Sequence, residues 1–247
     1  MITFAIMNNP YMRCCKMIHT KSLSILLSIV LCICLICCTC SPVNAESSSL
    51  WQGKLWYAFG DSITSLGYYI DTVNKELGTV SVKYDHSGFS YSQLAEVYTE
   101  MISDTIPSII TLFAGTNDFG HSGSIEEMEI GLRTILDGLY TAYPTVQIVI
   151  ITPLQRNFDH ESKPIETGGL GPNEQGLYLI DYVRAIRSIA ETYGTPCLDL
   201  YSCGGINLIN AREKTMDGDG LHPSKSYGPV IGHIIARFIN QFAPYDP

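Results

Sequence analysis

Short apolar runs alternate with longer stretches of helical periodicity along most of this chain. Such alternation predicts a parallel sheet, because neighbouring parallel strands are joined by crossover connections, usually helices, that cover the faces of the sheet. The expected strands lie at residues 55–59, 80–84, 109–113, 146–151 and 196–200, and the expected helices at 68–77, 90–101, 124–139, 179–189 and 224–242. We therefore expect one α/β domain on a mainly parallel five-stranded sheet.

Residues 1–45 differ in character from the rest. Three basic residues precede an apolar run at 23–38, which ends in a small-residue segment with Val and Ala at positions −3 and −1 of a cleavage before Glu46. This is the layout of a secretory signal peptide, so we expect an exported protein. Two alternatives remain open. One is a lipoprotein leader with Cys38 as the lipidated residue, and the other is a retained anchor helix, for which the run is short of the ~20 residues that a span needs.

The expected mature domain, residues 46–247, is strongly acidic. Loss of the leader removes three of the 15 Lys and Arg residues and none of the 24 Asp and Glu residues, so the formal net charge changes from −9 to −12. Such a surface repels nucleic acid and anionic lipid. We expect no nucleic-acid partner, and contact with a membrane only through an N-terminal lipid anchor. The oligomeric state is not indicated.

Outside the leader only two cysteines remain, Cys197 and Cys203. Two thiols in an exported chain favour a disulfide, although the gap between them is short and two buried free thiols are the alternative. No neighbouring histidine or cysteine completes a ligand set, so we expect no metal site.

A polar segment rich in Gly and Pro, residues 152–175, joins the fourth expected strand to the next helix. Loops of this length in compact domains are usually functional. Its polar side chains near the strand are Gln155, Arg156, Asn157 and His160. We name Gln155 and Arg156 as candidate substrate contacts, together with Asp61, which follows the first strand.

A serine and an aspartate–histidine pair have the residue types of a nucleophilic site. Ser62 follows the first strand, and Asp219 stands three residues before His222 in a Gly-rich segment. A serine hydroxyl is a weak nucleophile until a base takes its proton, and a third group must hold that base in the right tautomer. Each feature alone has a simpler interpretation, with Ser62 as a helix N-cap and the other two as surface loop residues.

Acyl transfer also needs hydrogen-bond donors directed at the developing oxyanion. Gly88 would let the backbone approach a ligand closely, and Asn117 carries a side-chain NH₂ donor, although both stand in segments typical of ordinary turns. Asp61 and Asp118 we interpret as supports for their turns rather than as proton-transfer groups.

Four motifs in order resemble the conserved blocks of the SGNH (GDSL-like) hydrolase superfamily: Gly60-Asp61-Ser62, Gly88, Gly115-Thr116-Asn117-Asp118 and Asp219-Gly220-Leu221-His222. The resemblance covers the whole of the expected mature domain, and the order of the motifs makes it specific where each alone is weak. It implies a flavodoxin-like three-layer α/β/α sandwich. The lipase-type elbow Gly-x-Ser-x-Gly is absent because Thr64 replaces its second glycine, which argues against the α/β-hydrolase fold.

The resemblance also implies roles for individual residues. Ser62 would be the nucleophile, His222 the general base and acid, and Asp219 its orienting partner. The oxyanion hole would consist of the Ser62 and Gly88 N–H groups and the Asn117 side chain, and no cofactor would be needed.

We expect a secreted serine esterase that uses a Ser-His-Asp acyl-enzyme mechanism to remove short acyl groups, above all acetyl, from a carbohydrate. The polar loop and the acidic surface favour a small acyl group on a polar carrier. A lysophospholipase or thioesterase acting on longer acyl chains would use the same residues. A carbohydrate-binding homologue without turnover is a third possibility, and an FMN-binding domain is disfavoured by the negative charge of Asp61 after the first strand.

Overall fold

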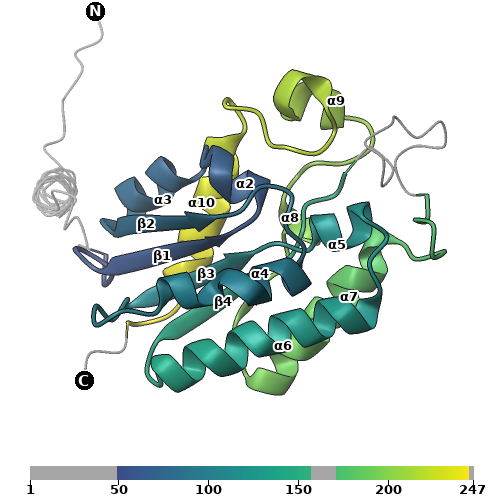
Figure 1. Cartoon of the computed structure of the whole chain (residues 1–247). Coiled ribbons are helices and arrows are strands. Elements are labelled where there is room, and N and C mark those ends of the chain that lie inside the picture. Colours follow the sequence, from purple (N-terminus) through teal and green to yellow (C-terminus); the bar gives the residue numbers. More distant parts are fainter. Residues whose placement is uncertain (1–48, 157–170, 245–247) are drawn as a thin grey trace, which may run out of the picture. The chain divides into compact units, whose positions relative to one another are not determined.

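The computed structural model describes residues 49–156 and 171–244 (Figure 1). The expected leader, with the lipidation candidate Cys38, lies outside these residues, as do Asn157 and His160. Among the described residues, no helix combines the length and apolar character needed to cross a membrane.

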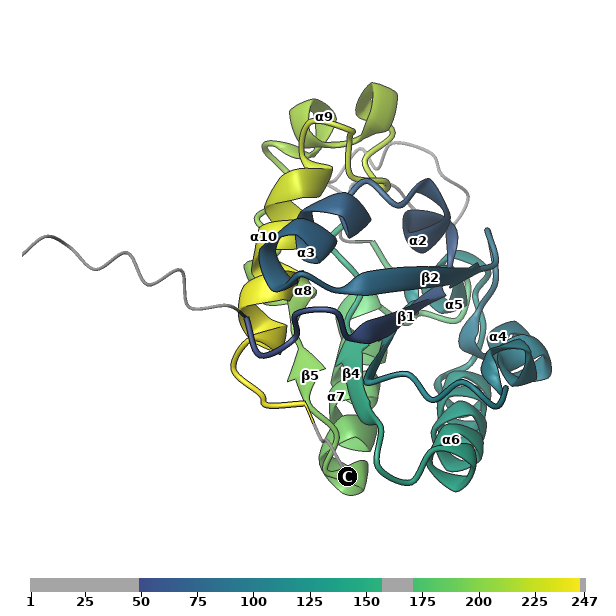
Figure 2. The ribbon, with the colours of Figure 1, turned by 90° about the vertical axis from the view of Figure 1, so that its left-hand side faces the viewer.

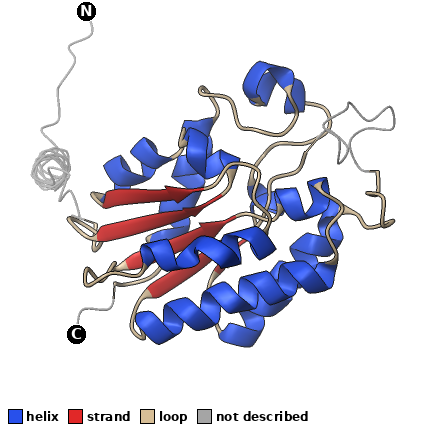
Figure 3. Cartoon of the chain, viewed as in Figure 1, coloured by secondary structure: helices blue, strands red, loops and turns tan. Residues whose placement is uncertain are grey.

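Five parallel strands form the central sheet in the order β2-β1-β3-β4-β5 (Figure 3). Their bounds are β1 Leu55–Gly60, β2 Val80–Asp85, β3 Ile109–Phe113, β4 Gln147–Ile151 and β5 Cys197–Leu198. This order is the flavodoxin-like one, with the switch point between β1 and β3, so the predicted fold class is confirmed. β5 is shorter than predicted because the Asp199 side chain caps a helix that begins at Leu200.

Helices cover both faces of the sheet (Figure 2). One face carries α4 (Tyr91–Val97), α6 (Ile125–Ala142) and α7 (Leu179–Tyr193), and the other carries α3 (Ile70–Leu77) and α10 (Gly228–Ile239). The shorter elements are α2 (Ser62–Leu66), α5 (Thr116–Gly120), α8 (Leu200–Cys203), α9 (Ala211–Lys214) and the 3₁₀ turns Tyr98–Met101 and Met216–Gly218. The result is the expected three-layer sandwich.

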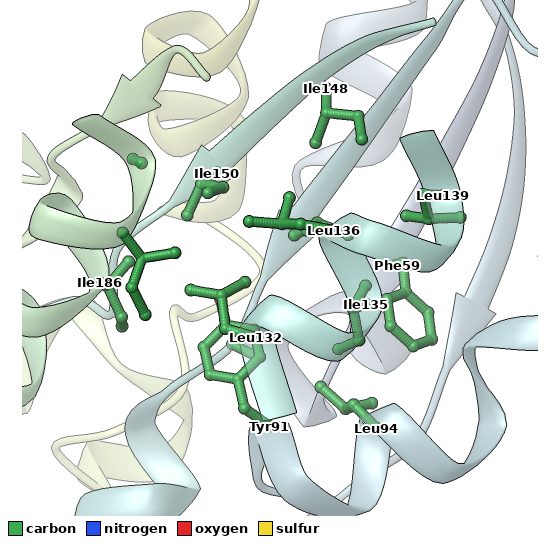
Figure 4. Packing of buried hydrophobic residues seen from close by; sticks show 14 of the residues in the cluster. Phe59, Tyr91, Leu94, Leu132, Ile135, Leu136, Leu139, Ile148, Ile150 and Ile186 are labelled. Carbon is green, nitrogen blue, oxygen red and sulfur yellow. The ribbon is translucent and has the colours of Figure 1, made fainter. Parts of the chain in front are cut away.

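Alternate strand residues supply the two cores, because successive side chains of a strand point to opposite faces. In β1, Tyr57 and Phe59 pack with the helices of the α4–α6–α7 face, whereas Trp56 and Ala58 pack with those of the α3–α10 face. Figure 4 shows part of the first core, where the apolar side of α6 faces the sheet. Met128, Leu132, Ile135, Leu136 and Leu139 lie at helical spacing along α6, and all of them are buried.

The expected disulfide is not formed. Cys197 and Cys203 are both free thiols, the first partly buried and the second exposed. Cys197 packs against the core on the α4–α6–α7 face, and burial raises the pKa of its thiol to about 12. Cys203 instead ends α8, the short helix that Asp199 caps directly after β5. The predicted disulfide was therefore wrong. The alternative, two buried free thiols, is correct in that both thiols are free but not in their burial, since Cys203 is exposed.

Candidate active site

Ser62 is the first residue of α2, directly after β1. The helix is capped by Asp61, whose carboxylate accepts a hydrogen bond of 3.0 Å from the N–H of Ile63. The Ser62 hydroxyl therefore has no capping role, and the simpler interpretation of this residue is wrong. Its Oγ lies 2.8 Å from Nε2 of His222.

The second ring nitrogen of His222 meets Asp219. Nδ1 lies 2.6 Å from Oδ2 of Asp219, while the other carboxylate oxygen accepts the N–H groups of Leu221 and of His222 itself at 2.8 and 3.0 Å. Partial burial alone would raise the pKa of Asp219, but these hydrogen bonds outweigh it and hold the pKa below its usual value. An ionised Asp219 keeps the ring proton on Nδ1, so Nε2 is left to accept the proton of Ser62.

The loop that carries both residues is closed by its own hydrogen bonds. The buried Thr215 donates from Oγ1 to Ala211 O at 2.6 Å and accepts the Gly220 N–H at 2.8 Å. The N–H of Met216 donates to His222 O at 2.7 Å. Thr215 was not predicted, because a threonine before a Gly- and Asp-rich segment is ordinary turn chemistry and carries no distinct signal.

Gly88 and Asn117 follow β2 and β3, the strands on either side of β1. Because the strands are parallel, these residues and Ser62 lie at the same edge of the sheet. Gly88 has φ +83°, a backbone conformation that favours glycine, and the space beside its Cα is open, since an added Cβ would meet no atom within 4 Å. The Asn117 side chain donates through Nδ2 to Phe89 O at 3.0 Å, next to Gly88.

The two acidic residues of these motifs are buried. Asp61 and Asp118 are 0% and 2% exposed. Burial raises the pKa of Asp61 to about 6 against the lowering effect of the Ile63 N–H, and it raises that of Asp118 to about 7 against the lowering effect of the Tyr91 N–H. Both support their turns, as expected. The further expectation that Asp61 contacts substrate does not fit its position, because the side chain has no exposed surface.

We expect the folded chain to lose stability as the pH rises from about 5 to about 8. A carboxyl group whose pKa is raised by folding holds its proton more tightly in the folded state. Its contribution is complete below the usual pKa of 3.8 and is lost as the pH rises through about 6 for Asp61 and about 7 for Asp118. From pH 5 to pH 8 only the last unit or so of this range is crossed for Asp61, which corresponds to roughly 1 kcal/mol of unfolding free energy for this residue. Thermal unfolding measured at about pH 5 and at about pH 8 should show the higher Tm at pH 5.

The variant Asp61→Asn tests the origin of this dependence. Asparagine caps helices as well as aspartate does but does not ionise, so the Tm difference between the two pH values should shrink. The matched control is Asp71→Asn, which removes an exposed carboxylate from the first turn of α3 and should leave the difference unchanged. A wild-type Tm that increases towards pH 8 would contradict the expectation.

Gln155 and Arg156 follow β4, and both are held by neighbouring segments. Gln155 donates to Tyr201 O at 3.2 Å. Arg156 is 4% exposed, donates from Nη1 to O and Oγ1 of Thr116, and lies over the Phe119 ring at 5.4 Å from its centroid. Gln155 is partly exposed and Arg156 lines a cavity, so the substrate contact of each stays a prediction.

That cavity has a volume of about 260 Å³ and lies between α5, the segment after β4 and the start of α7. Besides Arg156, its walls are Phe119, Gly171, Tyr178, Leu179, Ile180 and Tyr201. Most of these side chains are apolar or aromatic, so the cavity suits an apolar group better than a sugar hydroxyl cluster.

A comparison with protein families agrees with this geometry. The family model of GDSL-like lipases and acylhydrolases matches residues 58–226, which include Ser62, Gly88, Asn117, Asp219 and His222. The chain belongs to the GDSL-like lipase/acylhydrolase family. Membership supports hydrolysis of carboxylic esters as the activity of this GDSL-like protein. Across the described residues, no cluster of three or more His, Cys, Asp or Glu side chains is arranged to hold a metal ion.

Solved structures similar to this GDSL-like chain share its fold. A protein from Lactobacillus plantarum is 24% identical, with a TM-score of 0.64 over 77% of this chain and 98% of that one. The lipase/acylhydrolase from Enterococcus faecalis is 18% identical, with a TM-score of 0.60 over 78% and 100%. The acetyl xylan esterase AlAXEase is 19% identical, with a TM-score of 0.58 over 75% and 99%. No curated protein gives a significant match to the sequence.

Proposed function

We propose that this protein is a serine esterase in which Ser62, His222 and Asp219 form a catalytic triad. The observation that carries the proposal is the pair of hydrogen-bond distances, 2.8 Å from Ser62 to His222 and 2.6 Å from His222 to Asp219. A nucleophile, a base and an orienting carboxylate in this order are the parts that acyl transfer requires.

In the proposed cycle, Ser62 Oγ attacks the ester carbonyl carbon while Nε2 of His222 takes the hydroxyl proton. The negative charge on the carbonyl oxygen is held by the N–H groups of Ser62 and Gly88 and by the Asn117 amide. When the intermediate collapses, the C–O bond to the alcohol breaks and His222 returns the proton to the leaving oxygen. Water then attacks the acyl-enzyme with His222 as base again, which releases the acid and restores Ser62.

We further propose an acetylated carbohydrate as the substrate. The polar segment after β4 and the acidic surface of residues 46–247 suit a small acyl group on a neutral polar carrier. One structural neighbour is named an acetyl xylan esterase, which makes acetyl transfer to water a reasonable activity for this fold. The leader at residues 1–45 would place the enzyme outside the cell, where such polymers occur. The N-terminal residue of the processed protein tests this part, as Glu46 on protein recovered from the medium or as a lipidated Cys38 on protein recovered from the membrane fraction.

Hydrolysis of longer acyl esters is the second candidate, favoured by the cavity beside Phe119, which stands two residues after Asn117 in α5. Its apolar walls would remove the carbons of a medium acyl chain from water, worth about 0.8 kcal/mol for each buried CH₂ group. An acetyl group would leave this space unused.

Rates with p-nitrophenyl acetate, butyrate and octanoate decide between the two candidates. If acetylated carbohydrate is the substrate, kcat/KM should be highest for acetate. If the cavity binds the acyl chain, octanoate should be preferred, and Ile180→Trp, which fills part of the cavity, should lower octanoate hydrolysis roughly tenfold or more while acetate hydrolysis changes little. Hydrolysis of no ester above the uncatalysed rate would contradict the esterase proposal itself.

A further inference from the structure

The turn at residues 86–90, which follows the edge strand β2, is held by hydrogen bonds to the end of β1 and to α5, the helix after β3. At its start, the N–H of His86 donates to Gly60 O, the last residue of β1, at 2.9 Å. Near its end, Phe89 O accepts a hydrogen bond of 3.0 Å from the Asn117 side chain, which follows β3. The position of this turn relative to β1 and β3 is therefore determined by specific hydrogen bonds.

Asp118 makes a further connection from α5 to the same segment. Its two carboxylate oxygens lie 3.1 and 3.2 Å from the N–H of Tyr91, the first residue of α4, which donates to them. Both residues are buried, at 2% and 1% exposure. Asn117 and Asp118 are consecutive, so α5 holds the chain on both sides of Ser90, at the carbonyl of Phe89 and at the N–H of Tyr91.

We propose that Asp118 is a positioning residue that fixes the separation between two oxyanion donors, the Gly88 N–H and the Asn117 amide. This inference rests on the proposed esterase function. A side-chain amide has two N–H donors, and one of those of Asn117 already bonds Phe89 O. The second can serve the oxyanion only while α5 and the turn keep their spacing. Without Asp118, the hydrogen bond from the Asn117 amide to Phe89 O would have to hold α5 and the turn together.

The role predicts an effect on turnover rather than on substrate binding. Oxyanion donors act mainly in the transition state, and they are effective at about 2.7–3.1 Å from the oxyanion. A donor displaced from this distance stabilises the transition state less. Asp118→Ala should therefore lower kcat for p-nitrophenyl acetate by roughly 10- to 100-fold and change KM by less than about threefold. Asp118→Asn keeps a carbonyl oxygen for the Tyr91 N–H, so it should recover most of that loss.

A double-variant cycle with Asn117→Ala separates positioning from a general effect on the fold. If Asp118 acts through Asn117, the double variant should be no slower than Asn117→Ala by more than about threefold, because the losses are then not multiplicative. The control is Tyr143→Phe, which removes the hydroxyl that bonds Met101 O and Ser103 N–H at the opposite edge of the sheet. It should lower Tm and leave kcat unchanged.

The outcomes distinguish the two proposals. Wild-type turnover in Asp118→Ala, or fully multiplicative losses in the cycle, would overturn the positioning role while the esterase function stands. Should Asp118→Ala fail to fold by circular dichroism, Asp118→Ser takes its place in the same cycle, with the same expected pattern. A wild-type protein without Ser62-dependent hydrolysis would instead overturn the esterase function.

Discussion

Replacement of Ser62 by alanine should lower kcat for ester hydrolysis by roughly 10⁴- to 10⁶-fold, which is the range seen when a triad serine is lost. The hydroxyl oxygen is the only non-hydrogen atom removed, and it lies 2.8 Å from Nε2 of His222, the proposed base. Because Asp61 caps α2, the helix does not depend on this hydroxyl, so Tm should remain within about a degree of the wild-type value. Steady-state hydrolysis of p-nitrophenyl acetate measures the loss.

Ser65→Ala is the matched control, since it makes the same change three residues later in α2. It should keep wild-type turnover. Residual activity in Ser62→Ala above a few per cent would mean that another group is the nucleophile. A parallel loss in both variants would point to damage to α2 rather than to loss of the nucleophile.

Asp219→Asn should lower kcat by roughly 10³- to 10⁴-fold with little change in Tm. One side-chain oxygen can still accept the N–H groups of Leu221 and His222, so the loop keeps its shape. The new NH₂ group, however, faces Nδ1 of His222, where only an acceptor keeps the ring proton in place. The ring must then carry its proton on Nε2, and it cannot take the proton of Ser62.

Two further variants make this result specific. Asp217→Asn changes an exposed residue of the same loop that has φ +51°, a conformation asparagine adopts readily, and it should keep wild-type kcat. Asp219→Ala should lower both turnover and Tm, because the N–H groups of Leu221 and His222 lose the carboxylate oxygen that accepts their hydrogen bonds. Near wild-type kcat in Asp219→Asn would show that another residue orients His222.

Much of the fold could be predicted because its long elements carry strong periodic signals. The buried strand at 109–113 is apolar at nearly every position. α6 begins close to the predicted start at residue 124, at a capping box in which Ser124 and Glu127 each accept the other's N–H. The short helices α2, α5, α8 and α9 were not predicted, because four or five residues do not complete enough turns to show a period of 3.6.

The site was predictable in part for a different reason. Ser62, Asp219 and His222 stand in motifs whose order is informative even though each motif alone is weak. The sequence could not show whether a given polar side chain is buried or exposed. An aspartate after a strand has the same one-dimensional pattern whether it faces a ligand, as expected for Asp61, or is enclosed as a helix cap. The same limit explains why two nearby cysteines were expected to bond and why Thr215 was overlooked.

His222 and Asp219, the proposed base and its proposed orienting partner, lie on one short loop that is closed by hydrogen bonds between Ala211 and His222. Because these hydrogen bonds lie within the loop, we expect a displacement of the loop to take His222 and Asp219 away from Ser62 together and to leave their own contact intact. Small loops can open at a lower free energy than the whole domain needs to unfold. We therefore expect heat inactivation to begin when this loop moves away from Ser62, at temperatures where the central sheet is still folded.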